Sequence, residues 1–354
     1  MILAFGGTTE GRTAIEVLEE AGKPYYYSTR TDGQRVPLHH GIRLTGTMDA
    51  NEMARFCRER DIRLLVDAAH PFAIELHRNV ASTTQALGLP AIRLERLYPD
   101  TPATRLATWC QDYTEVVARL ETLPVRRILA LTGVQTIAPL RPLWDDPRRE
   151  VYFRILDRAD SHALALAQGF PPDRLCHYHP GEDEALLMQR LRPDAIILKE
   201  SGQSGGFLAK TEAACGLGIA TFIVRRPPMP PGLACADGPH GLRRLVESLL
   251  PGFYDQRSGL TTGTCATASA VACVLALFCP EGEPRGTVPV ILPDGETLHV
   301  AIAHSRRTSA TCAEANTLKD GGDDPDVTNG LPLCATLSLL PPRPGTPPGD
   351  YDID

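Results

Sequence analysis

The stretch Gly6-Gly7-Thr8-Thr9-Glu10-Gly11-Arg12 follows the apolar run Ile2–Phe5 and opens a segment with helical periodicity. The order of strand, glycine turn and helix predicts the first unit of an α/β fold, in which backbone N–H groups contact a pyrophosphate. The spacing departs from G-x-G-x-x-G, so a tight turn with Thr8 or Thr9 as the helix N-cap explains the same residues. Both interpretations stay open here. The apolar stripe of the expected helix is Ala14, Val17, Leu18 and Ala21.

Short apolar runs alternate with amphipathic segments through the first 250 residues. This alternation is typical of β-α units and a parallel sheet. It predicts two Rossmann-like α/β halves, separated by an irregular, proline-containing stretch after Glu95. The expected strands are Ile2–Phe5, Pro24–Ser28, Ile42–Leu44, Leu64–Asp67 and Ala91–Leu94 in the first half, and Ile128–Leu131, Val151–Ile155, Ala195–Leu198 and Thr221–Val224 in the second.

Four domains or segments follow from the composition. We expect the first half over residues 1–96 and the second over 97–254. A glycine and threonine turn then leads into the alanine-rich run Ala266–Phe278, which should be helical. This change predicts a separate, partial α/β segment over 255–340 and a proline-rich tail over 341–354.

Charge argues against nucleic acid as a partner. The last hundred residues hold six Lys/Arg and thirteen Asp/Glu, and the first 254 hold thirty of each, so the net charge of −7 lies entirely in the last part. Phosphate neutralisation needs a basic face, which a neutral first part and an acidic second part do not suggest.

Composition also limits the compartment and the metal chemistry. The chain has no run of 18 or more apolar residues and no signal-peptide core at its start, so we expect a cytoplasmic protein that does not contact membranes. The ten cysteines form no C-x-x-C pair. We therefore predict neither a zinc ribbon nor a disulfide framework, and no metal site.

The end of the second expected strand carries Ser28-Thr29-Arg30, where an acidic residue would contact the ribose hydroxyls of NAD. A cation at this position favours the 2′-phosphate of NADP(H). A solvated surface arginine is the alternative.

Further turns follow strands of both halves. They contain Thr45-Gly46, Thr132-Gly133 and the loop Ser201–Gly206. Ligands of open α/β sheets bind along the carboxyl edge of the strands, so these turns are candidates for a cofactor site. The full set of candidate cofactor-binding residues is Gly6, Gly7, Thr8, Thr9, Gly11, Arg12, Arg30, Thr45, Gly46, Thr132, Gly133, Ser201, Gly202, Gly205 and Gly206.

Three residues are candidates for catalytic contacts. His70, before Pro71, orients a substrate carboxylate or lies near the transferred hydride, or else serves as a structural turn residue. Lys199 and Lys210 bracket the glycine-rich loop, where cations and N–H groups together form an anion site. Ordinary surface lysines are the alternative.

Taken together, these blocks resemble the precorrin-6A reductase family of cobalamin biosynthesis over residues 1–250. The matching blocks are Gly6–Arg12, Val66–Ala73, Arg93–Arg96, Leu131–Gly133, Phe153–Leu156, Lys199–Gly202 through Gly205-Gly206 to Lys210, and Val224–Pro227. The resemblance implies an oxidoreductase that reduces one macrocycle double bond of precorrin-6A or cobalt-precorrin-6A, with NADPH or NADH as hydride donor. The substrate carries many carboxylates, for which Arg12, His70, Arg93, Arg154, Lys199 and Lys210 are plausible partners.

The last part resembles the start of the cobalt-precorrin-5B C1-methyltransferase family. The matching residues are Gly259–Ala266 and Lys319–Thr328. That family uses S-adenosylmethionine, and its members extend further than Asp354, so we expect this cofactor only if the segment were complete. Other cobalamin-pathway enzymes are candidate partners. Two alternatives stay open: methyl transfer by the fused segment, and a nucleotide-binding module without catalysis.

Overall fold

The computed structural model describes residues 1–31, 36–96, 98, 106–179, 181–279 and 286–340. These residues form two compact units. Unit 1 contains Met1–Ala69, Leu76–Glu95 and the chain from Pro231 onward, and unit 2 contains His70–Glu75 and Arg96–Pro230.

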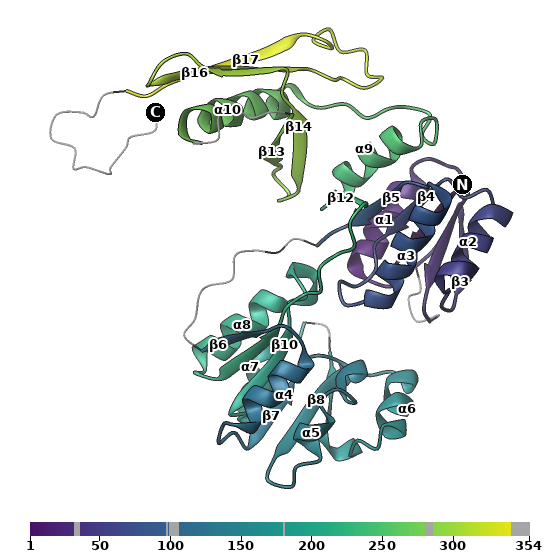
Figure 1. Ribbon diagram of the computed structural model, residues 1–354, viewed down its shortest axis with the longest axis vertical. Coiled ribbons are helices and arrows are strands. Elements are labelled where there is room, and N and C mark those ends of the chain that lie inside the picture. The colour runs from purple at the N-terminus through teal and green to yellow at the C-terminus, as the bar shows by residue number, and fades with distance from the viewer. Residues whose placement is uncertain (32–35, 97, 99–105, 180, 280–285, 341–354) are drawn as a thin grey trace. The chain divides into compact units, whose positions relative to one another are not determined.

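Unit 1 contains a six-stranded parallel sheet with the order β12-β5-β4-β1-β2-β3 (Figure 1). The glycine turn leaves β1, a central strand, so it lies in the middle of the carboxyl edge. The strands are β1 (Ile2–Phe5), β2 (Tyr25–Thr29), β3 (Gly41–Thr45), β4 (Leu64–Asp67), β5 (Ala91–Leu94) and β12 (Ala234–Ala236). The helices are α1 (Thr9–Glu19), α2 (Ala50–Glu59), α3 (Ile74–Leu87) and α9 (Pro239–Leu249).

Helices cover both faces of this sheet. On one face, α1 and α9 contribute Leu18 and Val246 to a core with Ile2. On the other, α2 and α3 pack around Leu3 through Met53 and Val80. Strands buried on both faces read as continuous apolar runs, which is why β1 and β4 were recognisable in the sequence.

Unit 2 contains a second six-stranded parallel sheet with the order β6-β11-β10-β7-β8-β9. Two apolar cores lie on its faces. The strands are β6 (Ala107–Cys110), β7 (Arg127–Ala130), β8 (Glu150–Leu156), β9 (Leu175–Tyr178), β10 (Ala195–Lys199) and β11 (Ala220–Val224). The helices are α4 (Tyr113–Glu121), α5 (Arg141–Trp144), α6 (Ala159–Ala167), α7 (Glu184–Leu191) and α8 (Phe207–Gly216), with short 3-10 turns at Val134–Thr136, Pro172–Arg174 and Gln203–Gly205.

The prediction of two parallel-sheet α/β halves is confirmed, and every strand named from the sequence is present within one or two residues. The sequence missed β6, β9 and β12. Residues 231–254 also belong to a different half than the sequence predicted. The sequence analysis assigned them to the second half, whereas the structure places them in unit 1. In the structure, β12 pairs with β5 and Tyr254 donates a hydrogen bond to the carbonyl of Val17 (2.9 Å), so this stretch completes the first sheet.

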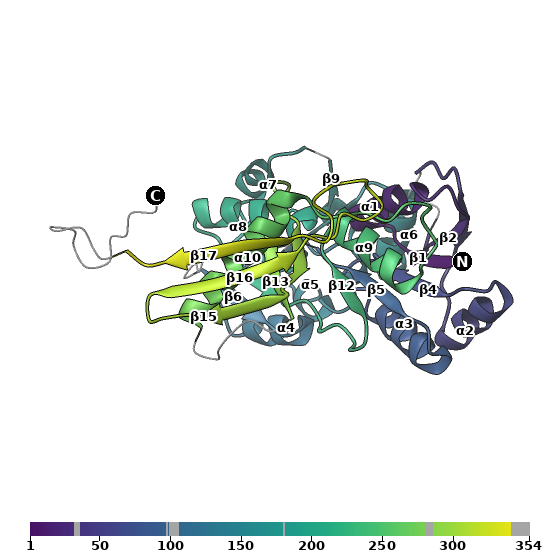
Figure 2. The same cartoon turned by 90° about the horizontal axis from the view of Figure 1, so that it is seen from above.

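The last part of the chain is a helix against antiparallel strands. Helix α10 (Thr262–Phe278) lies against a three-stranded sheet, and Ala272 packs with Val288 and Ala313 in one core (Figure 2). The sheet contains β15 (His304–Arg307), β16 (Cys312–Leu318) and β17 (Pro332–Ser338), and β13 (Thr287–Ile291) pairs with β14 (Thr297–Ala301). The proline-rich tail expected at 341–354 lies outside the described residues.

Two further features concern the cysteines and the length of the helices. All ten cysteines are free in this structure. Among the described residues, no helix combines the length and apolarity that crossing a bilayer requires.

Candidate functional site

In unit 1, the glycine turn after β1 is shaped by Tyr27 of β2. A Cβ atom at Gly6 would collide with the phenol ring of Tyr27, whose hydroxyl accepts a hydrogen bond from the Gly7 N–H (3.0 Å). Gly7 has a φ of +96°, which favours glycine. The close approach of β2 therefore requires glycine at position 6, and the left-handed backbone conformation favours glycine at position 7. The role of Tyr27 could not be predicted from the sequence, because it depends on the register between neighbouring strands.

Thr8 is the N-cap of α1. Its hydroxyl accepts from the Gly11 N–H (3.0 Å) and donates to the carbonyl of Ala68 (2.7 Å), which ties the turn to the end of β4. The N-cap interpretation is thus confirmed for Thr8, whereas Thr9 is the first residue of the helix. Capping and phosphate binding are compatible, because the positive end of α1 stays at the sheet edge.

Four more candidate residues lie at the same edge of unit 1. Arg12 is exposed on the first turns of α1, and Arg30 is exposed directly after β2. Thr45 is the last residue of β3, and the N–H of the following Gly46 donates to the carbonyl of Thr29 (3.0 Å). The carboxyl ends of β1, β2 and β3 are neighbours, so the structure brings together the candidates of this half.

A buried charge network lies at the end of β4 and was missed by the sequence analysis. Asp67 is fully buried and contacts His77 Nδ1 (2.5 Å) and Arg93 Nη1 (3.0 Å). The same carboxylate accepts from the Ala69 N–H (3.1 Å). Burial alone would raise the pKa of Asp67, but the hydrogen bond with His77 and the charge of Arg93 outweigh it, so this pKa is lowered. The network fixes the loop that leaves β4.

Arg93 and Arg154 correct two expectations about the substrate. Arg93 has no exposed surface, and its guanidinium donates to Asp67, to Glu95 and to the carbonyl of Ala69 (2.9 Å). Arg154 is also buried and is held by both carboxylate oxygens of Glu184 (2.6 and 2.8 Å). Both arginines serve the fold, because a substrate carboxylate cannot reach a guanidinium that is enclosed and paired.

In unit 2, three cations surround the loop between β10 and α8. Lys210 Nζ donates to the carbonyl of Gly205 (2.6 Å), and Arg96 Nη1 donates to the carbonyl of Ser201 (2.7 Å). A Cβ at Gly205 would collide with the Ser201 side chain and lie 3.2 Å from Arg96. Lys199, the last residue of β10, lies over the ring of Phe72 (5.4 Å to its centroid). The sequence predicted both lysines as site residues. It did not predict Arg96 at this loop, because Arg96 follows β5, far from the loop along the chain.

The two lysines carry strongly shifted pKa values. Burial, together with the smaller effects of the nearby charges of Lys210 and Arg96, lowers the pKa of Lys199 to about 8. Burial likewise lowers the pKa of Lys210 to about 8, with Arg154 adding to the effect and Glu184 opposing it. Several partly desolvated cations around a glycine loop form a site that an anion would stabilise, because it would restore the lysines' ordinary pKa.

His70 takes part in the turn after β4. Its Nδ1 accepts a hydrogen bond from the Phe72 N–H (3.2 Å), and its carbonyl accepts from the Ala73 N–H (2.8 Å). The neutral ring therefore carries its proton on Nε2. Thr132 and Gly133 also form a turn, in which the Thr132 hydroxyl contacts the Thr136 hydroxyl (2.5 Å) at the carboxyl end of β7. His70, Thr132, Gly133 and the lysine loop all belong to unit 2.

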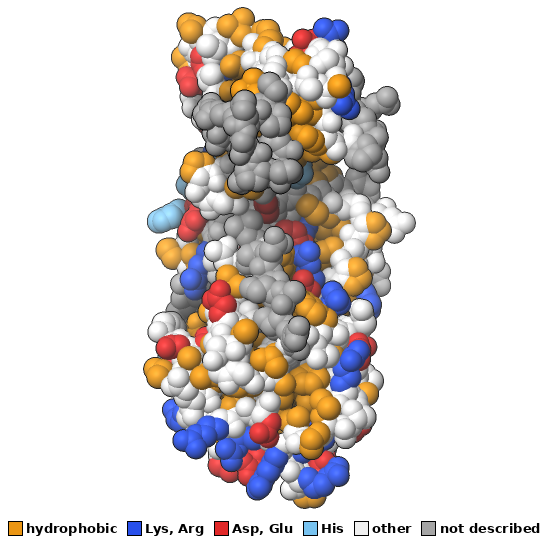
Figure 3. All heavy atoms as spheres, turned by 90° about the vertical axis from the view of Figure 1, so that its left-hand side faces the viewer, with side chains coloured by type: hydrophobic (Ala, Val, Ile, Leu, Met, Phe, Trp, Pro, Cys, Tyr) orange, Lys and Arg blue, Asp and Glu red, His pale blue; other side chains and the backbone are white. Residues whose placement is uncertain are grey.

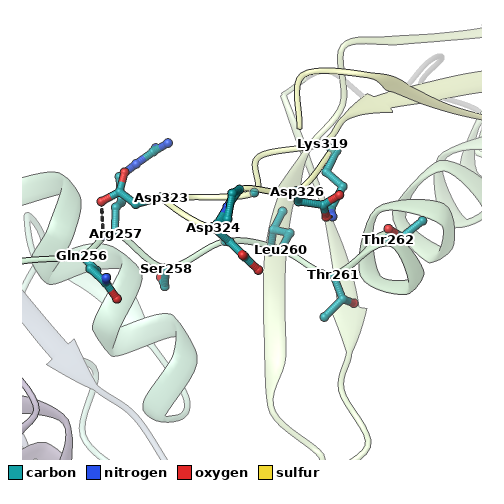
Figure 4. Close-up of a pocket in the computed structure, with 13 residues that line it drawn as sticks. Gln256, Arg257, Ser258, Leu260, Thr261, Thr262, Lys319, Asp323, Asp324 and Asp326 are labelled. Atoms are coloured by element: carbon teal, nitrogen blue, oxygen red, sulfur yellow. Dashed lines mark hydrogen bonds and ion pairs between the residues drawn. The ribbon is translucent and has the colours of Figure 1, made fainter. Parts of the chain in front are cut away.

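The fused segment has a pocket of about 690 Å³ (Figure 4). It is lined by residues 256–262 and by six residues between 319 and 326, and these two stretches overlap those that carry the methyltransferase resemblance. Backbone hydrogen bonds hold them together, since the Leu260 N–H donates to the Asp320 carbonyl (2.7 Å) and the Asp323 N–H to the Arg257 carbonyl (3.0 Å). Lys319 is paired with Asp326 at one end of the pocket.

Charged side chains are mixed on the face of the molecule in Figure 3. Lys and Arg are most frequent toward the lower end of this view, with Asp and Glu among them.

Comparison with known proteins gives two matches along the chain. Residues 1–247 match the family model of precorrin-6x reductase CbiJ/CobK, and residues 252–346 match that of CbiD. A precorrin-6A reductase from Rhodococcus erythropolis is 31% identical over 260 residues, which are 70% of this chain and 98% of the relative. A cobalt-precorrin-6A reductase from a Synechocystis species is 27% identical, covering 66% of this chain and 90% of the relative.

The fused segment and the fold have their own relatives. A cobalt-precorrin-5B C(1)-methyltransferase from Pseudomonas fluorescens is 47% identical over 89 residues, 25% of this chain. This match spans only 23% of that methyltransferase. The solved structure of CobK precorrin-6A reductase has a TM-score of 0.58 and 20% identity, covering 72% of this chain and 98% of that one, and it agrees with the fold of the first 250 residues.

Proposed function

We infer the reaction of this protein from one premise: the chain belongs to the precorrin-6x reductase family CbiJ/CobK. It is an oxidoreductase of cobalamin biosynthesis that acts on a carbon–carbon double bond, and a CbiD-like segment is fused to it. The family match over residues 1–247 is the observation that carries this conclusion. The hydride chemistry belongs to the nicotinamide cofactor, and the protein contributes binding and orientation.

For the cofactor, we propose NADPH bound at the carboxyl edge of the unit 1 sheet. The glycine turn and the N-terminus of α1 would hold the pyrophosphate, with Arg12 beside it. Arg30 would contact the 2′-phosphate, and Thr45 and Gly46 would line the same edge. The support is that these residues follow three neighbouring strands and that both arginines are exposed.

For the substrate, we propose that the loop Ser201–Gly206 in unit 2 binds carboxylates of a precorrin-6A macrocycle, with or without cobalt. Lys199 and Lys210 would supply the charge, and Gly202, Gly205 and Gly206 let the backbone approach. Charge-assisted hydrogen bonds of this kind fix orientation without a net basic protein. His70, Thr132 and Gly133 remain candidates for contact with the bound ligands, because they occupy turns of the same unit.

The direct test supplies precorrin-6A and cobalt-precorrin-6A, each with NADPH or NADH. We expect oxidation of the cofactor and a product that has gained two hydrogens, followed by cofactor absorbance and product mass. Tight nucleotide binding without oxidation on either substrate would support the alternative of a non-catalytic module and contradict the proposed reaction.

The preference for NADPH depends on Arg30. We expect Arg30→Ala to raise the KM for NADPH about 10- to 100-fold and to leave the KM for NADH nearly unchanged, since one charge-assisted hydrogen bond contributes about 1.5–3 kcal/mol. Steady-state kinetics with both cofactors measures this. Arg58→Ala, which removes another exposed arginine on α2, is the matched control. Equal losses for the two cofactors would show that Arg30 does not recognise the 2′-phosphate.

A second candidate function concerns the pocket of the fused segment. Its lining unites both stretches that match cobalt-precorrin-5B C(1)-methyltransferases. If this pocket retains ligand binding, S-adenosylmethionine should bind to the purified chain with one site. Gly259→Val should abolish this binding, because a Cβ at position 259 would collide with the backbone of Gly321. If calorimetry detects no binding of S-adenosylmethionine, this second candidate function is contradicted and the reductase reaction is the remaining proposed activity.

A further inference from the structure

Two histidines and an aspartate meet at the carboxyl edge of the unit 2 sheet, away from the lysine loop in the strand order. Asp157 follows β8, His162 lies on α6, and His177 lies on the edge strand β9. Each offers one ligand atom, and these atoms all lie within 4.8 Å of one another. The proposed reductase reaction uses none of the three residues.

The contacts within this group orient the two rings. His162 Nε2 lies 3.1 Å from Asp157 Oδ1, and the rings of His162 and His177 are 4.8 Å apart between centroids, at 57° to each other. In addition, His177 Nε2 is buried and has no hydrogen-bond partner among the described residues. A buried ring nitrogen without a partner is costly, and a metal ion is a ligand that would satisfy it, as an ordered water would.

We propose that Asp157, His162 and His177 bind a divalent first-row transition-metal ion such as Zn²⁺. Imidazole nitrogens and a carboxylate oxygen are the donors that this class of ion prefers. Tetrahedral zinc with bonds of about 2.0–2.1 Å needs donor atoms roughly 3.3 Å apart, so the present separations require only a small closure of the side chains. Three protein ligands leave the fourth position to water or to a carboxylate.

Another group of metal-binding residue types is less suited. In the group His240, Asp294 and Glu296, the Glu296 carboxylate already accepts from the His240 N–H (3.1 Å) and the Gly241 N–H (2.5 Å) at the start of α9. This carboxylate is therefore engaged as a helix cap. A variant in this second group is therefore a useful control, because it removes the other candidate metal ligands of the described residues and leaves Asp157, His162 and His177 in place.

The test uses the untagged full chain, titrated with ZnCl₂ and with CoCl₂ in separate calorimetry and absorption experiments. We expect one equivalent of metal, and Co²⁺ should give the visible absorption bands of a nitrogen- and oxygen-ligated site. His162→Ala and His177→Ala should each weaken binding at least about tenfold, as loss of a ligand costs no less than loss of an outer-shell partner.

His240→Ala and His304→Ala are the controls and should leave the stoichiometry and affinity unchanged. Thermal unfolding without metal checks that each variant folds; His162 is more than a third exposed, so its replacement should be tolerated. Unchanged binding in His162→Ala, loss of binding in His240→Ala, or no metal bound by the wild type at millimolar ZnCl₂ would each overturn the proposal. None of these results bears on the reductase assignment, which is measured by cofactor oxidation.

Discussion

Asp67→Asn is expected to lower the free energy of unfolding by about 3–5 kcal/mol, the usual cost of removing one partner from a buried ion pair. Asp67 has no exposed surface, and its carboxylate is the shared partner of His77, Arg93 and the Ala69 N–H. In the variant, the Arg93 guanidinium would stay buried without a full counter-charge. Denaturant unfolding followed by circular dichroism measures the loss.

The control is Asp145→Asn, which breaks an exposed pair with Arg141 four residues away and should cost only a few tenths of a kcal/mol. Acidity provides a second check. Because the folded-state pKa of Asp67 is below its unfolded value, its contribution is present at neutral pH and disappears as the pH falls below about 4. The difference between wild type and variant should shrink in that range. A variant as stable as the control would show that the network does not hold the fold.

The sequence was sufficient to predict strands that consist of one continuous apolar run. The runs Ile2–Phe5, Leu64–Asp67 and Ala91–Leu94 are buried on both sides and became β1, β4 and β5 without any shift in their bounds. The lysine loop was also visible, because Lys199 ends a buried strand and glycines follow it directly. The order of residues along the chain therefore predicts a single strand and the loop that follows it at the carboxyl edge of the sheet.

The sequence was insufficient where residues meet through the sheet. Asp67, His77 and Arg93 come from β4, α3 and β5, and their contacts depend on strand order and on helix docking. Arg93 looked like a substrate ligand because an arginine in a family block suggests carboxylate binding, and only its burial revealed the structural role. The strands β9 and β12 are short and lie at sheet edges, so neither has the continuous apolar run of a central strand.

The same limit applies to the proposed metal group. Asp157, His162 and His177 have no recognised metal-binding spacing in the sequence, which predicted no metal site. The register Ile155↔His177 sets β9 beside β8 and so places His177 near Asp157, which directly follows β8. A ligand set built across two strands and a helix leaves no local motif.

Lys210→Met is expected to lower kcat/KM for the macrocycle about 10- to 150-fold, mainly through KM, because one charge-assisted hydrogen bond contributes about 1.5–3 kcal/mol. This prediction rests on the proposed role of the loop in binding carboxylates. Lys199→Met should have an effect of similar size. The matched control is Lys23→Met, since Lys23 is more than a third exposed and pairs with Asp255 in unit 1. Steady-state kinetics at pH 7 with saturating cofactor measures the three variants.

The pH dependence separates a charge effect from a structural one. With pKa values lowered to about 8, Lys199 and Lys210 lose their protons as the pH rises through 8, so the KM for the macrocycle should increase there. An ordinary lysine would stay charged until about pH 10.4. In Lys210→Arg the cation persists, and the increase in KM above pH 8 should be smaller than in the wild type. Two results would show that the charge of the loop does not bind the substrate. One is a KM for the macrocycle that stays constant from pH 7 to 9.5. The other is a Lys210→Arg variant that loses as much activity as Lys210→Met at pH 7 and whose KM rises with pH as steeply as that of the wild type.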